Sequence, residues 1–107
     1  MAIDNTAVID AVAYEESKLI LQLYDHLEFT EDIEKDHMFM LQEKLNSYIW
    51  YVDTKQYEET YADVNFDLFE IQIKFKYQPS DFCIEYLNHA NNKLQALNIK
   101  IVYECTE

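Results

Sequence analysis

The sequence predicts one α+β domain over residues 1–107, in which two helices pack on one face of a single four-stranded sheet. The sheet is expected to be antiparallel or mixed, with the element order β-β-α-β-α-β. Two patterns predict this fold: apolar and polar residues alternate without a break over 69–77, and apolar residues recur at helical spacing over 34–54 and 81–97. Hydrophobic residues make up 50% of the chain, which favours a globular fold despite the net charge of -13.

The first elements predicted are the two strands of a hairpin. Residues 7–14 are rich in β-branched and small apolar residues, and the polar turn 15–17 interrupts them. Residues 18–24 then place leucine at every second position, the pattern of a half-buried strand. An acidic connector over 25–36 leads into the first helix.

That helix is predicted over 34–54 from one apolar stripe facing the core. Its members are Met38, Leu41, Leu45, Tyr48, Ile49 and Val52. Phe39, Trp50 and Tyr51 lie off the stripe, so the helix either packs on two sides or offers a contact surface. Residues 56–65 lack a clean period and are predicted to be a partly helical connector.

A strand over 69–77 and a second helix over 81–97 follow. Pro79 and Ser80 predict the stop and the N-cap, and Asp81 in the first turn complements the helix dipole. Asn98 is expected to end the helix in a left-handed conformation, and 99–103 form the last strand. The stripe predicted to face the core contains Cys83, Leu87, Ala90, Leu94 and Leu97.

Two absences restrict the function. The chain has no glycine, so no Rossmann or P-loop phosphate cradle can be written, and left-handed turns must fall on residues such as Asn65, Asn98 or aspartates. It has no arginine either, and its negative field repels polyanions. Direct nucleic-acid binding is therefore not expected.

The composition also predicts the compartment. The two cysteines, Cys83 and Cys105, are too few for a disulfide framework. The first residues lack a basic segment followed by an apolar run, and no stretch approaches the roughly 20 apolar residues of a membrane span. We expect a cytoplasmic protein with no membrane contact.

Four phrases give the chain a resemblance to a known family. They read NTAVID at 5–10, LYDHLE at 23–28, LQEKLNSY at 41–48 and FKYQP at 75–79. They resemble a bacterial family of unknown function, number 6572, along nearly the whole chain. The resemblance implies a compact α+β fold and a bacterial, cytosolic origin, and it brings no catalytic residue with it.

Candidate catalytic and metal-binding residues are few. Asp25, His26 and Glu28, or Asp36 with His37, supply ligand types that suit divalent cations, but their spacing fits no closed site, and a solvated acidic rim is the better interpretation. Cys83 lies on the predicted buried stripe, where apolar surroundings raise a thiol pKa. We therefore predict no metal, no cofactor and no enzymatic activity.

The distribution of charge carries the functional hypothesis. Residues 1–36 hold ten acids and two lysines, and residues 53–67 hold five acids and one lysine. Solubility alone explains such charge, but aromatic residues mixed with acids are also typical of surfaces that capture basic proteins. Small acidic proteins of this character are similar to immunity proteins and antitoxins, which neutralise a basic nuclease-type toxin by covering its active site.

In this hypothesis the acids and the rings form one continuous patch. The acids are Glu28, Glu31, Asp32, Glu34, Glu58, Glu59 and Asp63, and the aromatic anchors are Trp50, Tyr57 and Tyr61. One alternative is a homo-oligomeric structural or adaptor protein, such as a homodimer that buries Phe39, Trp50 and Tyr51. Another is a small hydrolase or metal-binding enzyme, for which the sequence offers no recognisable set of residues.

Overall fold

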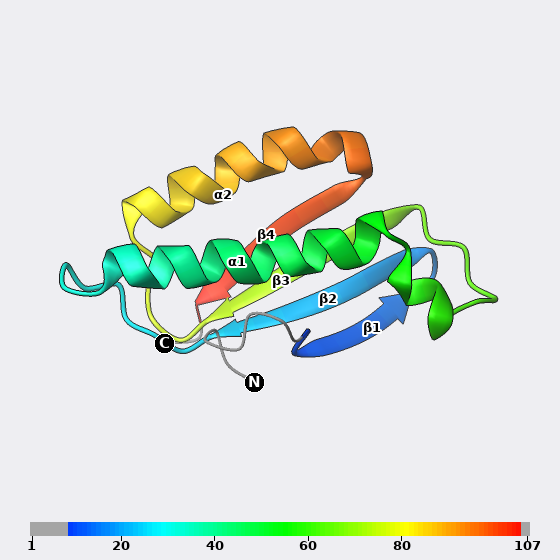
Figure 1. Cartoon of the computed structure of the whole chain (residues 1–107), viewed down its shortest axis with the longest axis horizontal. Helices are drawn as coiled ribbons and strands as arrows, with labels where there is room; N and C mark the ends of the chain where they lie inside the picture. Colours follow the sequence, from blue (N-terminus) through cyan, green and yellow to red (C-terminus); the bar gives the residue numbers. More distant parts are fainter. Residues whose placement is uncertain (1–8, 106–107) are drawn as a thin grey trace.

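A computed structural model describes residues 9–105 of the chain (Figure 1). Two strands, a long helix, a strand, a shorter helix and a last strand follow one another, with two short 3-10 helices between them. The elements are β1 (Ala11–Glu15), β2 (Lys18–Asp25), α1 (Glu34–Asp53), η1 (Gln56–Glu59), β3 (Leu68–Phe75), α2 (Asp81–Leu94), η2 (Gln95–Leu97) and β4 (Ile99–Cys105). The predicted α+β class and element order are confirmed.

The four strands form one mixed sheet in the order β1-β2-β3-β4. β1 pairs with β2 as an antiparallel hairpin, whereas β2, β3 and β4 are parallel neighbours. Parallel neighbours require a crossover, and α1 and α2 provide the two crossovers. Both helices therefore begin at the carboxyl edge of the parallel strands and run back along the sheet (Figure 1).

The core lies between the sheet and the two helices. Leu21, Ile71 and Ile101 are in register on the three parallel strands, and all three are buried. The alternate residues of the same strands are half-buried or exposed, so the helices cover one face and leave the other open. We call this uncovered side the open face. The strict alternation arises because successive side chains of a strand point to opposite faces.

α1 buries the predicted stripe except Ile49, which is half-buried, together with two residues that the stripe did not include. Met38, Leu41 and Tyr48 face the sheet as expected. His37 and Lys44 are also fully buried, because they fall on the same side of the helix and each finds an acidic partner.

α2 begins with the cap that the sequence predicted. The Ser80 side chain accepts a hydrogen bond of 3.2 Å from the backbone N–H of Cys83, and Asp81 lies in the first turn. The regular helix ends at Leu94 and tightens into η2, so the predicted end at residue 97 is three residues too far. Leu97 is 41% exposed, and its assignment to the core stripe is wrong.

Three residues other than glycine adopt positive φ values among residues 9–105. Asn98 is left-handed at φ 60°, as expected, because its short polar side chain tolerates this conformation. Glu16 in the hairpin turn and Lys55 after α1 supply the other two positions. Asn65 is not one of them, so that expectation is wrong.

The first strand is shorter than predicted. β1 starts at Ala11, after a bend at Asp10, and residues 7 and 8 of the predicted strand lie outside the described residues.

On the other edge of the sheet, the side-chain amide of Asn91 accepts a hydrogen bond of 2.7 Å from the N–H of Ile101 and donates one of 3.0 Å to its C=O. Asn91 thus occupies edge groups of β4 that would otherwise be open to another strand. Within residues 9–105, no helix combines the length and the apolar composition needed to cross a membrane.

Candidate partner-binding surface

The acidic loop, residues 26–33, connects β2 to α1 and is fixed by a buried pair beneath it. Asp25 ends β2 and His37 lies in the first turn of α1, and both side chains are fully buried. The His37 Nε2 lies 2.6 Å from one carboxylate oxygen of Asp25 and 2.8 Å from the other. The pair ties the carboxyl end of a central strand to the start of the helix.

The other ring nitrogen of His37 holds the loop itself. Its Nδ1 lies 3.2 Å from the carbonyl oxygen of Glu28. Both ring nitrogens therefore lie within hydrogen-bond distance of an oxygen atom, one at the end of β2 and one in the loop. The Leu27 N–H donates to Asp25 at 3.1 Å, and the ring of Phe29 stacks on His37 at a centroid distance of 4.0 Å.

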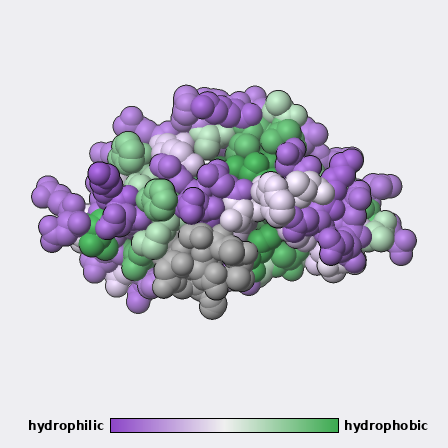
Figure 2. Space-filling view, in the orientation of Figure 1, coloured by the Kyte–Doolittle hydropathy of each residue, from purple (hydrophilic) through white to green (hydrophobic). Residues whose placement is uncertain are grey.

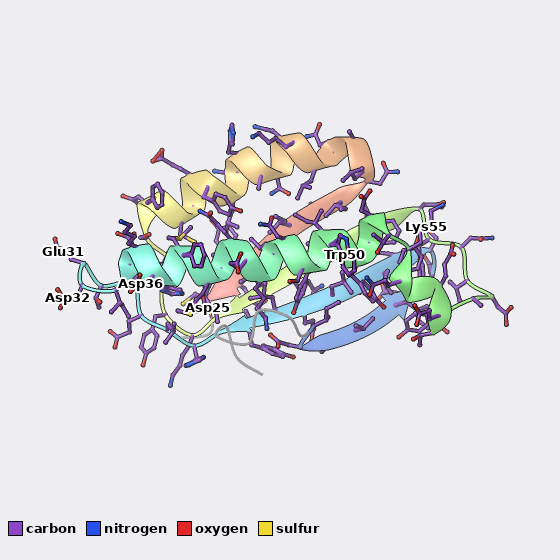
Figure 3. All side chains as sticks on the ribbon, in the orientation of Figure 1. Asp25, Glu31, Asp32, Asp36, Trp50 and Lys55 are labelled. Atoms are coloured by element: carbon purple, nitrogen blue, oxygen red, sulfur yellow. The ribbon has the colours of Figure 1, made fainter. Side chains whose placement is uncertain are left out.

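These contacts present four of the predicted acids at one end of α1. Glu28, Glu31 and Asp32 are exposed on the loop, and Glu34 is half-buried at the first position of the helix. Figure 3 shows Glu31 and Asp32 beyond the start of α1, with Asp36 on the first turn. Negative groups at this position are also favourable for the helix, since the amino end of its dipole is positive.

The outward face of α1 carries aromatic and acidic side chains together. Phe39 is 63% exposed and Trp50 is 61% exposed, on the side opposite the core. Asp36, Glu43 and Asp53 are exposed on the same side, so the five residues follow one another at spacings of three, four, seven and three residues. We call these five residues the α1 ridge. Of these five residues, the predicted partner-binding site included Trp50 alone. The other four could have been identified in the sequence from their helical spacing on the side away from the apolar stripe.

A second buried ion pair holds the opposite side of α1 to the sheet. The Lys44 Nζ lies 2.9 Å from Asp10 Oδ1, with both side chains fully buried, and Asp10 Oδ2 accepts from the Tyr24 N–H at 2.8 Å. One turn along, the Tyr48 hydroxyl donates to the Gln22 carbonyl at 2.6 Å and accepts from the Asp10 N–H at 3.0 Å. Burial raises the pKa of the Tyr48 phenol above its usual value.

The other predicted residues lie past the end of α1, in and after η1. Tyr57 is only 8% exposed and packs on Phe69 and Phe66, with ring centroids 5.1 and 5.7 Å apart. Its assignment as an exposed anchor is wrong, because the chain folds back after Lys55 and buries the ring. Burial, and then the charge of Glu58, raise the pKa of its hydroxyl.

The remaining residues at this end are less deeply placed. Tyr61 is half-buried against the Tyr14 ring, at 5.3 Å between centroids, whereas Glu58, Glu59 and Asp63 are exposed. The predicted acids therefore fall into two groups, one in the loop before α1 and at its first residue, and one in and after η1 beyond its other end (Figure 1). The helix has 20 residues, which corresponds to about 30 Å at 1.5 Å per residue. The fold therefore does not bring the two groups of acids together in one compact patch. The α1 ridge runs along the helix between the two groups.

The open face of the sheet is balanced in charge, whereas the chain as a whole has an excess of acids. Its strands present three lysines and three glutamates: Lys18, Lys74, Lys100, Glu15, Glu70 and Glu104. Lys18 pairs with Glu70 at 3.4 Å and Lys74 with Glu104 at 3.1 Å. The surplus of acids in the chain therefore lies outside these strand positions. The helix-covered side, seen in Figure 2, is mostly hydrophilic with separate hydrophobic areas.

Of the predicted candidate metal ligands, the fold brings Asp25 and His37 together as a pair. His37 pairs with Asp25 and not with its neighbour Asp36, while His26 is exposed. Over the part of the chain that the structure describes, no group of three or more His, Cys, Asp or Glu side chains could hold a metal ion.

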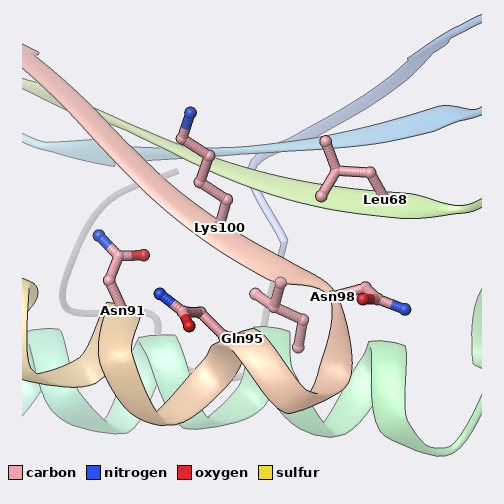
Figure 4. Close-up of a pocket in the computed structure, with 6 residues that line it drawn as sticks. Leu68, Asn91, Gln95, Asn98 and Lys100 are labelled. Atoms are coloured by element: carbon pink, nitrogen blue, oxygen red, sulfur yellow. The ribbon is translucent and has the colours of Figure 1, made fainter.

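A cavity of about 390 Å³ lies between the end of α2 and the start of β4 (Figure 4). It is lined by Leu68, Asn91, Gln95, Asn98, Ile99 and Lys100. Amides and one ammonium group can form hydrogen bonds, but this lining contains no carboxylate, imidazole or thiol for acid-base or nucleophilic chemistry.

The two cysteines are expected to react very differently with thiol reagents. Burial raises the pKa of the Cys83 thiol to about 12, with further contributions from the negative charges of Asp25 and Glu34. The reactive thiolate is therefore scarce and out of reach at Cys83, whereas Cys105 is partly exposed. At mildly alkaline pH, Ellman's reagent should modify one thiol per native chain and the second only after unfolding. The Cys105→Ser variant should show no fast thiol; a fast reaction in that variant would contradict the assignment.

The comparisons with known proteins give a family without an activity. The family of unknown function DUF6572 matches the chain over residues 1–107. Neither the curated proteins nor the solved structures include a match to the chain.

Proposed function

We propose a function for this chain, which belongs to the family of unknown function DUF6572: it is a binding module for a basic protein. In this proposal it acts as an immunity protein or antitoxin, and it neutralises a nuclease-type toxin by covering the active site. One observation carries the proposal: the acid surplus is displayed on the helices and loops, while the strand positions of the open face are balanced in charge. A module of this kind works by occlusion and needs no catalytic group.

The charge distribution suits fast capture of a cationic partner. A surface of one sign steers an oppositely charged cleft into contact and raises the association rate by about 10-fold to 1000-fold at low ionic strength. The acidic loop is positioned for this role because Glu31 and Asp32 extend beyond the start of α1 (Figure 3). Nuclease clefts bind phosphates and are therefore lined with positive charge, which such a surface complements.

The proposal places the protein in the cytoplasm. Cys83 and Cys105 are both free thiols, which suits a reducing compartment. An antitoxin must also be present where its toxin would act on nucleic acid.

The alternative, a homo-oligomeric structural or adaptor protein, has less support. A homodimer through Phe39 and Trp50 would place Asp36, Glu43 and Asp53 of two copies near one another, and like charges at short range repel. Tyr51, the third residue of that hypothesis, is half-buried against Tyr57, at 6.3 Å between ring centroids. Sedimentation that shows a stable dimer at low concentration would favour this alternative.

The test is protection from a toxin encoded beside the gene. Co-expression of the chain should restore the growth of cells that produce the toxin, and the purified pair should associate at a rate that falls with added salt. The Glu31→Gln/Asp32→Asn variant should associate about tenfold more slowly at low ionic strength.

The matched control removes the same amount of charge from the open face. The Glu70→Gln/Glu104→Gln variant has the same net charge, so it should associate at nearly the wild-type rate if the loop faces the partner. Equal slowing in both variants would mean that only total charge matters. A purified chain that neither binds the toxin nor protects the cell would refute the proposed function.

A further inference from the structure

We infer that the α1 ridge is a preformed rod that docks into a groove of the basic partner, with two apolar sockets in the groove and positive charge along its rims. The inference rests on the proposed function and adds the mode of recognition. Five residues carry it: Asp36, Phe39, Glu43, Trp50 and Asp53.

The two rings have the exposure and the spacing of paired anchors. Phe39 and Trp50 each leave more than half of their surface to solvent, although large aromatic side chains gain most from burial. They are eleven residues apart, close to three full turns, so they point to the same side at a separation of about 17 Å. Tryptophan in particular is enriched among residues that dominate binding energy.

The acids between the rings define the chemistry of the partner. Asp36 precedes Phe39 by one turn, Glu43 follows it by one turn, and Asp53 lies one turn after Trp50. Lys44, the next residue after Glu43, is turned into the core and paired with Asp10, and Lys35 is exposed in the first turn. A groove that accepts the rings must therefore offer lysines or arginines to the flanking carboxylates.

The helix is held rigidly from behind, so little order has to be created on binding. His37 is bonded to Asp25 near its start, and Lys44 and Tyr48 are bonded to Asp10 and Gln22 along its middle. A ligand element that is already in its bound shape binds more tightly, because less conformational entropy is lost. Grooves that receive one face of a helix recognise anchors at this kind of spacing.

A second copy of the chain does not fit this description. Two ridges brought together would oppose carboxylates with carboxylates, and the lysines in the strands of the open face are paired or balanced by glutamates. The partner is therefore a different, basic protein.

Trp50 supplies a direct test, because it is the only tryptophan of the chain. The chain is labelled with 5-fluorotryptophan and titrated with a catalytically inactive form of the neighbouring toxin, while calorimetry measures the affinity independently. Docking should shift the single fluorine resonance, and Phe39→Ala should weaken the affinity by at least about 30-fold, the loss typical of a central anchor. Phe82→Ala is the matched control: Phe82 is 58% exposed on α2, off the ridge, and its removal should change the affinity by less than about threefold.

A composition-matched variant tests the spacing of the sockets. Phe39→Glu/Glu43→Phe keeps the charge and the ring on the same face but moves the ring four residues closer to Trp50. Fixed sockets predict a loss as large as that of Phe39→Ala, whereas an affinity like that of the wild type would overturn the two-socket groove.

The remaining outcomes separate the inference from the proposed function. Calorimetric binding with an unmoved Trp50 resonance would overturn the ridge and leave the function standing. No binding at all would remove both. A resonance that moves with the concentration of the chain alone would show that a second copy covers the ridge, which also overturns the inference.

Discussion

Replacement of Lys44 by alanine is expected to lower the free energy of unfolding by about 3 to 5 kcal/mol, the largest effect of any lysine substitution we predict. The change leaves the Asp10 carboxylate inside the protein without the ammonium that now lies 2.9 Å away. A buried charge that loses its partner retains its full desolvation cost. The substitution therefore raises the free energy of the native state and leaves that of the unfolded state nearly unchanged. Urea unfolding followed by far-UV circular dichroism measures the loss.

Two variants control this experiment. Lys93→Ala removes an exposed lysine of α2 and should change stability by about 0.5 kcal/mol or less. Asp10→Asn/Lys44→Met removes both charges, keeps an oxygen for the Tyr24 N–H, and should recover most of the loss. A Lys44→Ala variant as stable as Lys93→Ala would show that the pair contributes nothing.

Replacement of Asp25 by alanine is expected to release the acidic loop and to cost about 3 kcal/mol. It takes the acceptor from His37 Nε2 and from the Leu27 N–H, two donors that lie in or near the core. The loop is then tied to α1 only through the weaker contacts of His37 with Glu28 and Phe29. Hydrogen exchange should show faster exchange of amides 26–33, together with a lower midpoint of urea unfolding.

Asp32→Ala is the matched control on the same loop. Its carboxylate is exposed, so stability and exchange should match those of the wild type within about 0.5 kcal/mol. If Asp25→Ala left the exchange of residues 26–33 unchanged, the buried pair would not be what positions the loop.

The secondary structure was predictable because it depends on local periodicity. Alternation predicted the buried face of β3, although the strand ends at Phe75, two residues before the predicted end at 77. Ser80 and Asn98 predicted the two ends of the second helical segment. The errors fall where local pattern is weak. Leu97 continues the helical spacing but lies beyond the point where α2 tightens into η2, and the positive φ values of Glu16 and Lys55 have no marker in their side chains.

The candidate surface was predictable only in part. The sequence suggested that the acids at 28–34 and at 58–63 form one continuous patch with Trp50, Tyr57 and Tyr61. Twenty residues of helix separate the two groups, and the turn at Lys55 buries Tyr57. Trp50 and Phe39 were recognisable from the sequence as lying off the stripe, whereas their exposure depends on which elements pack beside α1.

The sequence by itself determined the elements, the class of fold and the excess of negative charge, since each follows from residue types at short spacing. Only the tertiary structure decided that His37 and Lys44 are core residues. Their partners, Asp25 and Asp10, are 12 and 34 residues away, and burying a charged side chain is favourable only where the fold brings the opposite charge against it. The same long-range pairing decided which residues form the proposed binding surface, because fixing those two residues inward turns Phe39, Glu43 and Trp50 outward.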